Sequence, residues 1–230
     1  IAKGEEIHDE IARRGLLKKD ALVGTTLMEM YLKCDMFMKA EQVLEELPNR
    51  DVITWSTLIS GYAQQGQGHK SLKCFIQMQS EGFTPDKVTL LSVLTACSHS
   101  GLMSDARILF WNMTENYGLI PDIKHHTCMV MVFGHGGHFD EAISMINIMP
   151  SLHNPSIWLA LLGACRKWAT LELGRLVFDQ VVQVSSSHGA CIAAAYVLMA
   201  NIFVASGMKE DAKKLKGIVD SNVPETFCPV

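Results

Sequence analysis

The chain has 230 residues, of which 48% are hydrophobic and 19% charged, and its formal net charge is −4. No apolar run reaches the roughly 18 residues that a transmembrane helix needs, so we expect no membrane association. The seven cysteines include no C-x-x-C pair, which argues against a disulfide framework or a closed zinc site and fits a reducing compartment. The acidic balance by itself favours a protein-interaction scaffold, and the alternative is a nucleic-acid binder that recognises bases more than phosphates.

A small residue recurs on the second helix of each predicted helical pair, at intervals of 31, 35, 36, 32 and 38 residues. These residues are Ala40, Ser71, Ala106, Ala142, Gly174 and Ala212. Periods in this range mark stacked two-helix repeats that bury their apolar faces only against their neighbours. The sequence therefore predicts an all-α fold of stacked helix-turn-helix repeats.

Apolar residues mark one face of each predicted first helix, at positions i, i+3, i+4 and i+7, and we expect these positions in the core. They are Gly24, Leu27, Met28, Tyr31; Trp55, Leu58, Ile59, Tyr62; Leu90, Val93, Leu94, Cys97; His126, Met129, Val130, Phe133; and Trp158, Leu161, Leu162, Cys165. Residues able to take a positive φ follow the first helices, at Gly66, Gly68, Gly101, Gly136, Gly137 and Gly207. Proline closes units at Pro48, Pro85, Pro121 and Pro150.

The repeat sequences resemble one known family. Residues 1–20, with GEEIHDEIARRGLLKKD, are similar to part of a long L-type pentatricopeptide repeat (PPR). Residues 21–51, with M-Y-x-K-C and a closing P-x-R-D, resemble the short S type. Residues 52–86, VITWSTLISGYAQQGQGHKSLKCFIQMQSEGFTPD, resemble the P type, and residues 87–122, with T-A-C-S-H-S-G, resemble the L type.

The C-terminal part extends the resemblance. Residues 123–154 are similar to the last S-type repeat. Residues 155–188, with SIWLALLGACRKWATLELGRLVF, resemble the first E motif (E1), and residues 189–222, with YVLMANIFVASGMKEDAKKLKGIV, resemble the second (E2). A tail, residues 223–230, departs from the usual continuation. The chain thus resembles plant PLS-class PPR proteins with C-terminal E motifs, of the organellar RNA-editing factor type.

The resemblance implies a right-handed α-solenoid that binds single-stranded organellar RNA and selects a cytidine for C-to-U editing in a mitochondrion or chloroplast. It implies protein partners, namely multiple organellar RNA editing factors and a DYW-type deaminase that acts in trans or follows the E motifs. An organellar splicing or transcript-stability factor, or a protein-interaction scaffold of helical repeats, is an alternative. The first residue, Ile1, falls inside a repeat, so we expect a fragment of a longer protein whose transit peptide lies elsewhere.

The resembled family recognises one base per repeat with the fifth and last residues of that repeat. These map to Thr25 with Asp51, Ser56 with Asp86, Leu91 with Asp122, and Thr127 with Asn154. In the family a hydroxyl with Asp implies guanine and Thr with Asn implies adenine, whereas apolar Leu91 cannot hydrogen-bond to a base. The expected order, 5′ to 3′, is G, G, any, A. Without the resemblance, Thr25 and Ser56 are ordinary hydroxyls near helix N-termini.

The second residue of each repeat packs against the base in the resembled family. Leu22, Ile53 and Val88 fit this role, and Lys124 departs from it. We expect Lys124 either to contact phosphate or to leave its base loosely held.

Catalytic chemistry is not expected in this chain. A zinc deaminase needs H-x-E followed by P-C-x-x-C, and residues 8–10 (His-Asp-Glu) match only the first part. His135 and His138 have a possible metal-ligand spacing, but the glycines between them fit a turn and no third ligand is evident. We therefore expect no catalytic residue, no metal, no cofactor and no enzymatic activity of its own.

Overall fold

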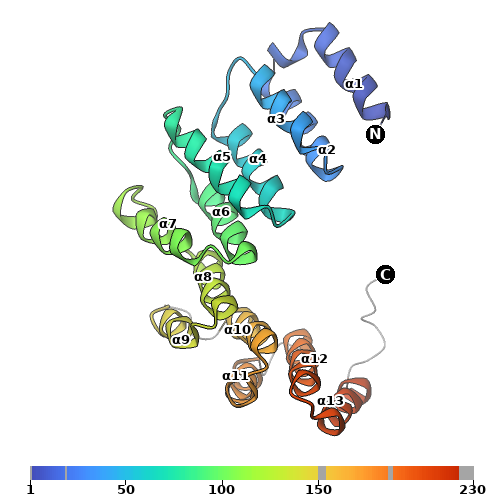
Figure 1. Cartoon of the computed structure of the whole chain (residues 1–230), viewed down its shortest axis with the longest axis vertical. Coiled ribbons are helices and arrows are strands. Elements are labelled where there is room, and N and C mark those ends of the chain that lie inside the picture. The colour runs from blue at the N-terminus through green and yellow to red at the C-terminus, as the bar shows by residue number, and fades with distance from the viewer. Residues whose placement is uncertain (1, 19, 150–153, 186–188, 223–230) are drawn as a thin grey trace. The chain divides into compact units, whose positions relative to one another are not determined.

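The fold is built from helices throughout the described residues, which are 2–18, 20–149, 154–185 and 189–222 of the computed structural model (Figure 1). Within these ranges the regular structure comprises thirteen α-helices and one short 3-10 helix, with no strand. The all-α fold predicted from the repeats is confirmed. The chain divides into two compact units, Ile1–Cys128 (unit 1) and Met129–Val230 (unit 2), and the boundary falls within helix α8.

Unit 1 consists of successive helical pairs. Its elements are α1 (Ala2–Arg13), η1 (Leu16–Lys18), α2 (Ala21–Lys33), α3 (Phe37–Glu46), α4 (Val52–Gln64), α5 (Gly68–Ser80), α6 (Lys87–Ser100), α7 (Met103–Glu115) and the first residues of α8 (Ile123–Gly136). Within a pair, α2 packs on α3, α4 on α5 and α6 on α7. The first helices also pack in series, since α4 contacts both α2 and α6. Stacking of first helices therefore joins neighbouring pairs (Figure 1).

Unit 2 begins with the last residues of α8 and, taken by itself, also contains helical pairs. Its further helices are α9 (Phe139–Asn147), α10 (Pro155–Trp168), α11 (Leu171–Val184), α12 (Gly189–Ala205) and α13 (Lys209–Asn222). Helix α10 packs on α11 and on α12, and α12 packs on α13. Two pairs thus occupy the ranges predicted as E1 and E2, although the S, P, L and E designations themselves stay predictions.

The core follows the predicted faces of the first helices with two exceptions. The side chains of Trp55, Leu58, Ile59 and Tyr62 are buried, as are those of the next predicted set on α6. The small residues of the repeat ladder are buried at all six positions. His126 and Trp158, however, were expected in the core and are only half-buried, so those two assignments are wrong. The ring of His126 instead meets Phe110 edge-on, with centroids 5.2 Å apart.

Four of the six glycines expected to take a positive φ do so in the structure. Gly66, Gly101, Gly137 and Gly207 adopt it, which confirms their role after the first helices. Gly68 and Gly136 do not, because each lies inside a helix. At Gly68 the constraint is space, since an added Cβ would lie 2.3 Å from Ser100 Oγ on α6. Pro150 falls outside the described residues.

Candidate nucleic-acid interface

The first helices from α2 to α10 each begin after an aspartate or asparagine that caps the helix. Asp51 Oδ1 accepts a hydrogen bond from the backbone N–H of Thr54 at 2.8 Å, and Asp86 Oδ1 accepts one from that of Thr89 at 2.8 Å. Equivalent 2.9 Å bonds join Leu22 N to Asp20, Lys124 N to Asp122 and Ser156 N to Asn154. Such caps satisfy backbone donors that the first turn leaves unpaired.

Sequence reasoning missed this capping role of Asp51, Asp86 and Asn154. The signal was present, because Asp or Asn directly before an apolar-periodic run is a helix-start pattern. The cap occupies Oδ1 of Asp86 and leaves Oδ2 without a hydrogen-bond partner among the described residues. An ionised carboxylate has about four lone-pair sites, so one residue can cap a helix and still accept from a ligand. Capping and base recognition are therefore compatible at this position.

The fifth-position hydroxyls lie one turn into the first helices, where each donates to the carbonyl four residues earlier. The bonds run from Thr25 Oγ1 to Ala21 O at 3.0 Å, from Ser56 Oγ to Val52 O at 2.6 Å and from Thr127 Oγ1 to Ile123 O at 2.7 Å. This bonding is common for hydroxyls in helices. It agrees with the alternative stated above, that Thr25 and Ser56 are ordinary hydroxyls near helix N-termini. Thr25 is only 7% exposed, whereas Ser56 and Thr127 are half-buried.

The second-position residues form a series of exposed aliphatic side chains. Leu22, Ile53 and Val88 are 69%, 65% and 62% exposed, although all three are apolar. They sit in the first turns of α2, α4 and α6, the helices that stack in series. An aliphatic side chain left in water at the same place in three stacked helices provides apolar surface for a repeating ligand such as a row of bases.

The structure brings together one predicted pair of base-recognition residues through a third residue. Ser56 Oγ lies 2.6 Å from Thr89 Oγ1, which in turn donates to Asp86 Oδ1 at 2.8 Å. No described interaction joins Thr25 to Asp51 in this way. Thr127 belongs to unit 1 and Asn154 to unit 2.

Asp122 and His125 form a hydrogen-bonded pair at the start of α8. His125 is buried, and its Nδ1 lies 2.7 Å from Asp122 Oδ1 while its Nε2 lies 3.0 Å from Lys87 O. Desolvation alone would raise the pKa of Asp122, but hydrogen bonds from His125 and Lys124 outweigh it and hold that pKa below its usual value. The carboxylate is therefore stabilised in its ionised form.

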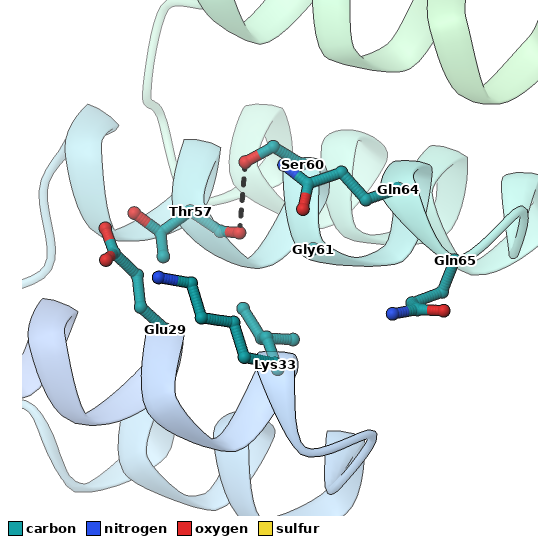
Figure 2. A pocket seen from close by; sticks show the side chains of 8 residues that line it. Glu29, Lys33, Thr57, Ser60, Gly61, Gln64 and Gln65 are labelled. Atoms are coloured by element: carbon teal, nitrogen blue, oxygen red, sulfur yellow. Dashed lines mark hydrogen bonds between the residues drawn. The ribbon is translucent and has the colours of Figure 1, made fainter. Parts of the chain in front are cut away.

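A cavity of about 410 Å³ opens between α2 and α4 (Figure 2). It is lined by Glu29, Leu32, Lys33, Thr57, Ser60, Gly61, Gln64 and Gln65. Figure 2 shows Glu29 and Lys33 of α2 facing Thr57 and Ser60 of α4. The two helices approach closely at Gly61, where an added Cβ would lie 2.5 Å from Leu32 Cδ1. With one acidic and one basic side chain beside hydroxyls and amides, the cavity suits a polar ligand that offers both donors and acceptors.

The histidines noted in the sequence lie apart from these features. His8 is on α1, with Nδ1 2.9 Å from the Tyr31 hydroxyl and Nε2 3.5 Å from Glu46. His138 precedes α9, with Nδ1 3.2 Å from Glu141. Within the described ranges no three His, Cys, Asp or Glu side chains are grouped so as to hold a metal ion. Nor does any helix of this described part combine the length and apolarity needed to cross a membrane.

Comparisons with known proteins agree with this architecture. A PPR repeat family model matches residues 50–99, and a PPR repeat model matches residues 25–52, 88–117 and 125–153. A putative pentatricopeptide repeat-containing protein of Arabidopsis thaliana is 33% identical over 221 residues, covering 96% of this chain and 44% of that protein. Another from the same plant, named as chloroplastic, is 34% identical over 217 residues, covering 94% and 24%. The chain therefore spans less than half the length of these curated relatives.

Solved structures with the same fold include two of the pentatricopeptide repeat protein PPR10. The crystal structure of PPR10 from maize gives a TM-score of 0.63 at 18% identity, covering 90% of this chain and 30% of PPR10. The crystal structure of PPR10 with an 18-nt psaJ RNA element gives 0.65 at 16% identity, covering 100% and 38%. At such low identity the likeness shows the fold, an α-solenoid, and no more.

Proposed function

The chain belongs to the pentatricopeptide repeat family, and from this premise we propose that it binds single-stranded RNA in a sequence-specific way. One observation carries the proposal. The first turns of α2, α4 and α6 each carry an exposed aliphatic residue. The next first helix in each case, α4, α6 or α8, begins with a capping carboxylate. A ligand that repeats along its length, with an apolar face and polar edges on each unit, matches such a series, and single-stranded RNA has this form.

Base selection follows from the groups that each junction presents. A carboxylate only accepts hydrogen bonds, and the Watson–Crick edge of guanine carries two adjacent donors, N1–H and N2–H2. Asp51 and Asp86 therefore favour guanine at the first and second bases. Leu91 offers no hydrogen bond at the third base, and Asn154, with both a donor and an acceptor, suits adenine at the fourth. The proposed readout remains G, G, any, A.

Within sequence-specific RNA binding, we propose that the protein acts as an adaptor in C-to-U editing. In this role the repeats select the position of a cytidine, the pairs α10–α11 and α12–α13 act as E motifs, and a DYW-type deaminase supplied elsewhere carries out the reaction. The sequence resemblance supports this role, and the relative named as chloroplastic favours an organelle as the location. A protein-interaction scaffold is the second candidate, because the net charge of −4 opposes attraction to phosphates.

A binding experiment separates these functions. We expect the protein to bind an oligonucleotide that contains G-G-N-A more tightly than one with the same bases scrambled. In the family code Asn with Asp implies uracil, so Ser56→Asn should move the preference at the second base from G towards U. Ser80→Asn is a matched control, because Ser80 is an exposed hydroxyl on the second helix of the same pair. Equal binding of both oligonucleotides would favour the scaffold, and an unchanged preference in Ser56→Asn would refute the base assignment.

A further inference from the structure

We propose that Thr89, a residue of the following repeat, is a positioning residue for recognition of the second base and acts through Ser56 and Asp86. The inference rests on the proposed function. Thr89 is the third residue of its own repeat, is 0% exposed and was not among the residues expected to take part in binding. Its hydroxyl contacts Ser56 on α4 and Asp86 before α6, the two residues assigned to the base of the preceding repeat.

The cluster has fewer hydroxyl protons than hydrogen-bond contacts. Ser56 Oγ lies 2.6 Å from Val52 O and 2.6 Å from Thr89 Oγ1, and Thr89 Oγ1 lies 2.8 Å from Asp86 Oδ1. These three contacts share only two hydroxyl protons. Because a carboxylate is the strongest acceptor present, Thr89 donates to Asp86. The single hydroxyl proton of Ser56 is then shared between Val52 O and Thr89 Oγ1, and the lone pairs of Ser56 are left for a ligand.

This arrangement sets the pattern that a base would meet. Ser56 presents acceptor lone pairs, and Asp86 presents the unused oxygen Oδ2. Two acceptors connected through Thr89 match the two donors of guanine and leave the N1 acceptor of adenine without a donor. Since Thr89 is buried and contacts both residues, it holds the two acceptors at a fixed separation. Removing its hydroxyl should therefore weaken selection of G over A.

The third residues of the two neighbouring repeats, Thr54 and His125, make different contacts from Thr89. Thr54 is equally buried, but its hydroxyl bonds only the backbone of Asp51, accepting from N at 3.0 Å and donating to O at 2.8 Å. His125 bonds the carboxylate of Asp122, yet the fifth residue of that repeat is Leu91. Among the described junctions, the hydroxyl of Thr89 alone joins both base-recognition residues. We therefore expect the second base to be selected most strictly.

The test compares variants of Thr89 by RNA binding, with G or A at the second base and, separately, at the first. For Thr89→Val we expect the G/A affinity ratio at the second base to fall about tenfold, the effect of one charge-assisted hydrogen bond, with the ratio at the first base unchanged. Thr89→Ser, which keeps the hydroxyl, should retain the wild-type ratio. Thr54→Val is the matched control, because it removes an equally buried hydroxyl and should leave the second-base ratio unchanged.

The outcomes distinguish this inference from the proposed function. If the wild-type protein does not prefer G-G-N-A, the proposed function fails. If it does and folded Thr89→Val keeps the wild-type ratio, or Thr89→Ser loses it, the positioning role is overturned. Circular dichroism reports folding, and Thr89→Cys, close in size with a weak donor, replaces the valine variant if that one does not fold. An intermediate ratio in Thr89→Cys supports the role, and a wild-type ratio overturns it.

Discussion

Capping and base recognition can be separated at Asp86 by two substitutions. In Asp86→Ala the helix α6 loses its cap and the junction loses its carboxylate. In Asp86→Asn an amide oxygen remains to accept from the backbone N–H of Thr89, while the negative charge is removed. The stability of the protein and its base preference should therefore change independently in the two variants.

The stability changes follow from the two hydrogen bonds that Asp86 Oδ1 accepts, both 2.8 Å long, from the backbone N–H and the hydroxyl of Thr89. Loss of an N-cap costs about 1 kcal/mol, within a range of roughly 0.5–2, so Asp86→Ala should lower the free energy of unfolding by that amount. Asn caps about as well as Asp, so Asp86→Asn loses only the favourable charge at the helix N-terminus, about 0.3–1 kcal/mol. Because Asp86→Ala loses both the cap and this charge, it should be the less stable of the two variants.

The assays are urea unfolding followed by circular dichroism, and RNA binding with each base at the second position. We expect Asp86→Asn to shift the preference from G towards A, as the family code for a hydroxyl with Asn implies, and Asp86→Ala to lose it. Asp51→Ala serves as the control, because it removes an equivalent cap and should affect the first base only. Equal destabilisation by Asn and Ala would refute the capping argument, and a retained preference for G in Asp86→Asn would refute the role of the charge.

Two further predictions concern the core and the carboxylate of Asp122. Leu58 is 2% exposed on the packed face of α4, so Leu58→Ala should destabilise the protein by about 2–5 kcal/mol in urea unfolding. The exposed Leu22 provides the control, and a cost for Leu58→Ala as small as that for Leu22→Ala would contradict the assignment of the helix face. Because the pKa of Asp122 is lowered in the folded state, its ionised form stabilises the protein above the ordinary pKa of about 4, and this contribution is lost as the pH falls through the folded-state pKa. The stability difference between wild type and Asp122→Asn should therefore shrink in acid, and a constant difference would count against this linkage.

The sequence was sufficient for most of the fold because the determinants are local. Apolar residues three and four apart define a helix face whatever the neighbours are, and Leu58 and Leu94 are buried as that rule predicts. The failures occur where the environment depends on other repeats. His126 occupies a core column but turns its ring to Phe110. The turns at Asp35 and Ala169 take positive φ without glycine, which a rule based on glycine does not detect.

The candidate site was less predictable for the same reason. The aliphatic residues at position two and the polar residues at position five follow from the repeat register alone. The hydrogen bonds that connect Ser56, Thr89 and Asp86 cross from one pair of helices to the next, so they depend on how α4 stacks on α6. No pattern within a single repeat specifies that contact. The corresponding hydroxyl of Thr54 makes different bonds although the residue type is the same.

The position of the capping residues restricts which side chains the last place of a repeat can hold. Helix N-caps favour Asn, Asp, Ser and Thr, because a short side chain must bring an oxygen back to the second or third backbone N–H. These residues are also the short polar groups that can meet the edge of a base without leaving the junction. A long or apolar residue at the place of Asp51 or Asp86 would thus cost stability and base recognition together. On the proposed function, a change of base preference at this place is compatible with the fold only within the set of capping residues.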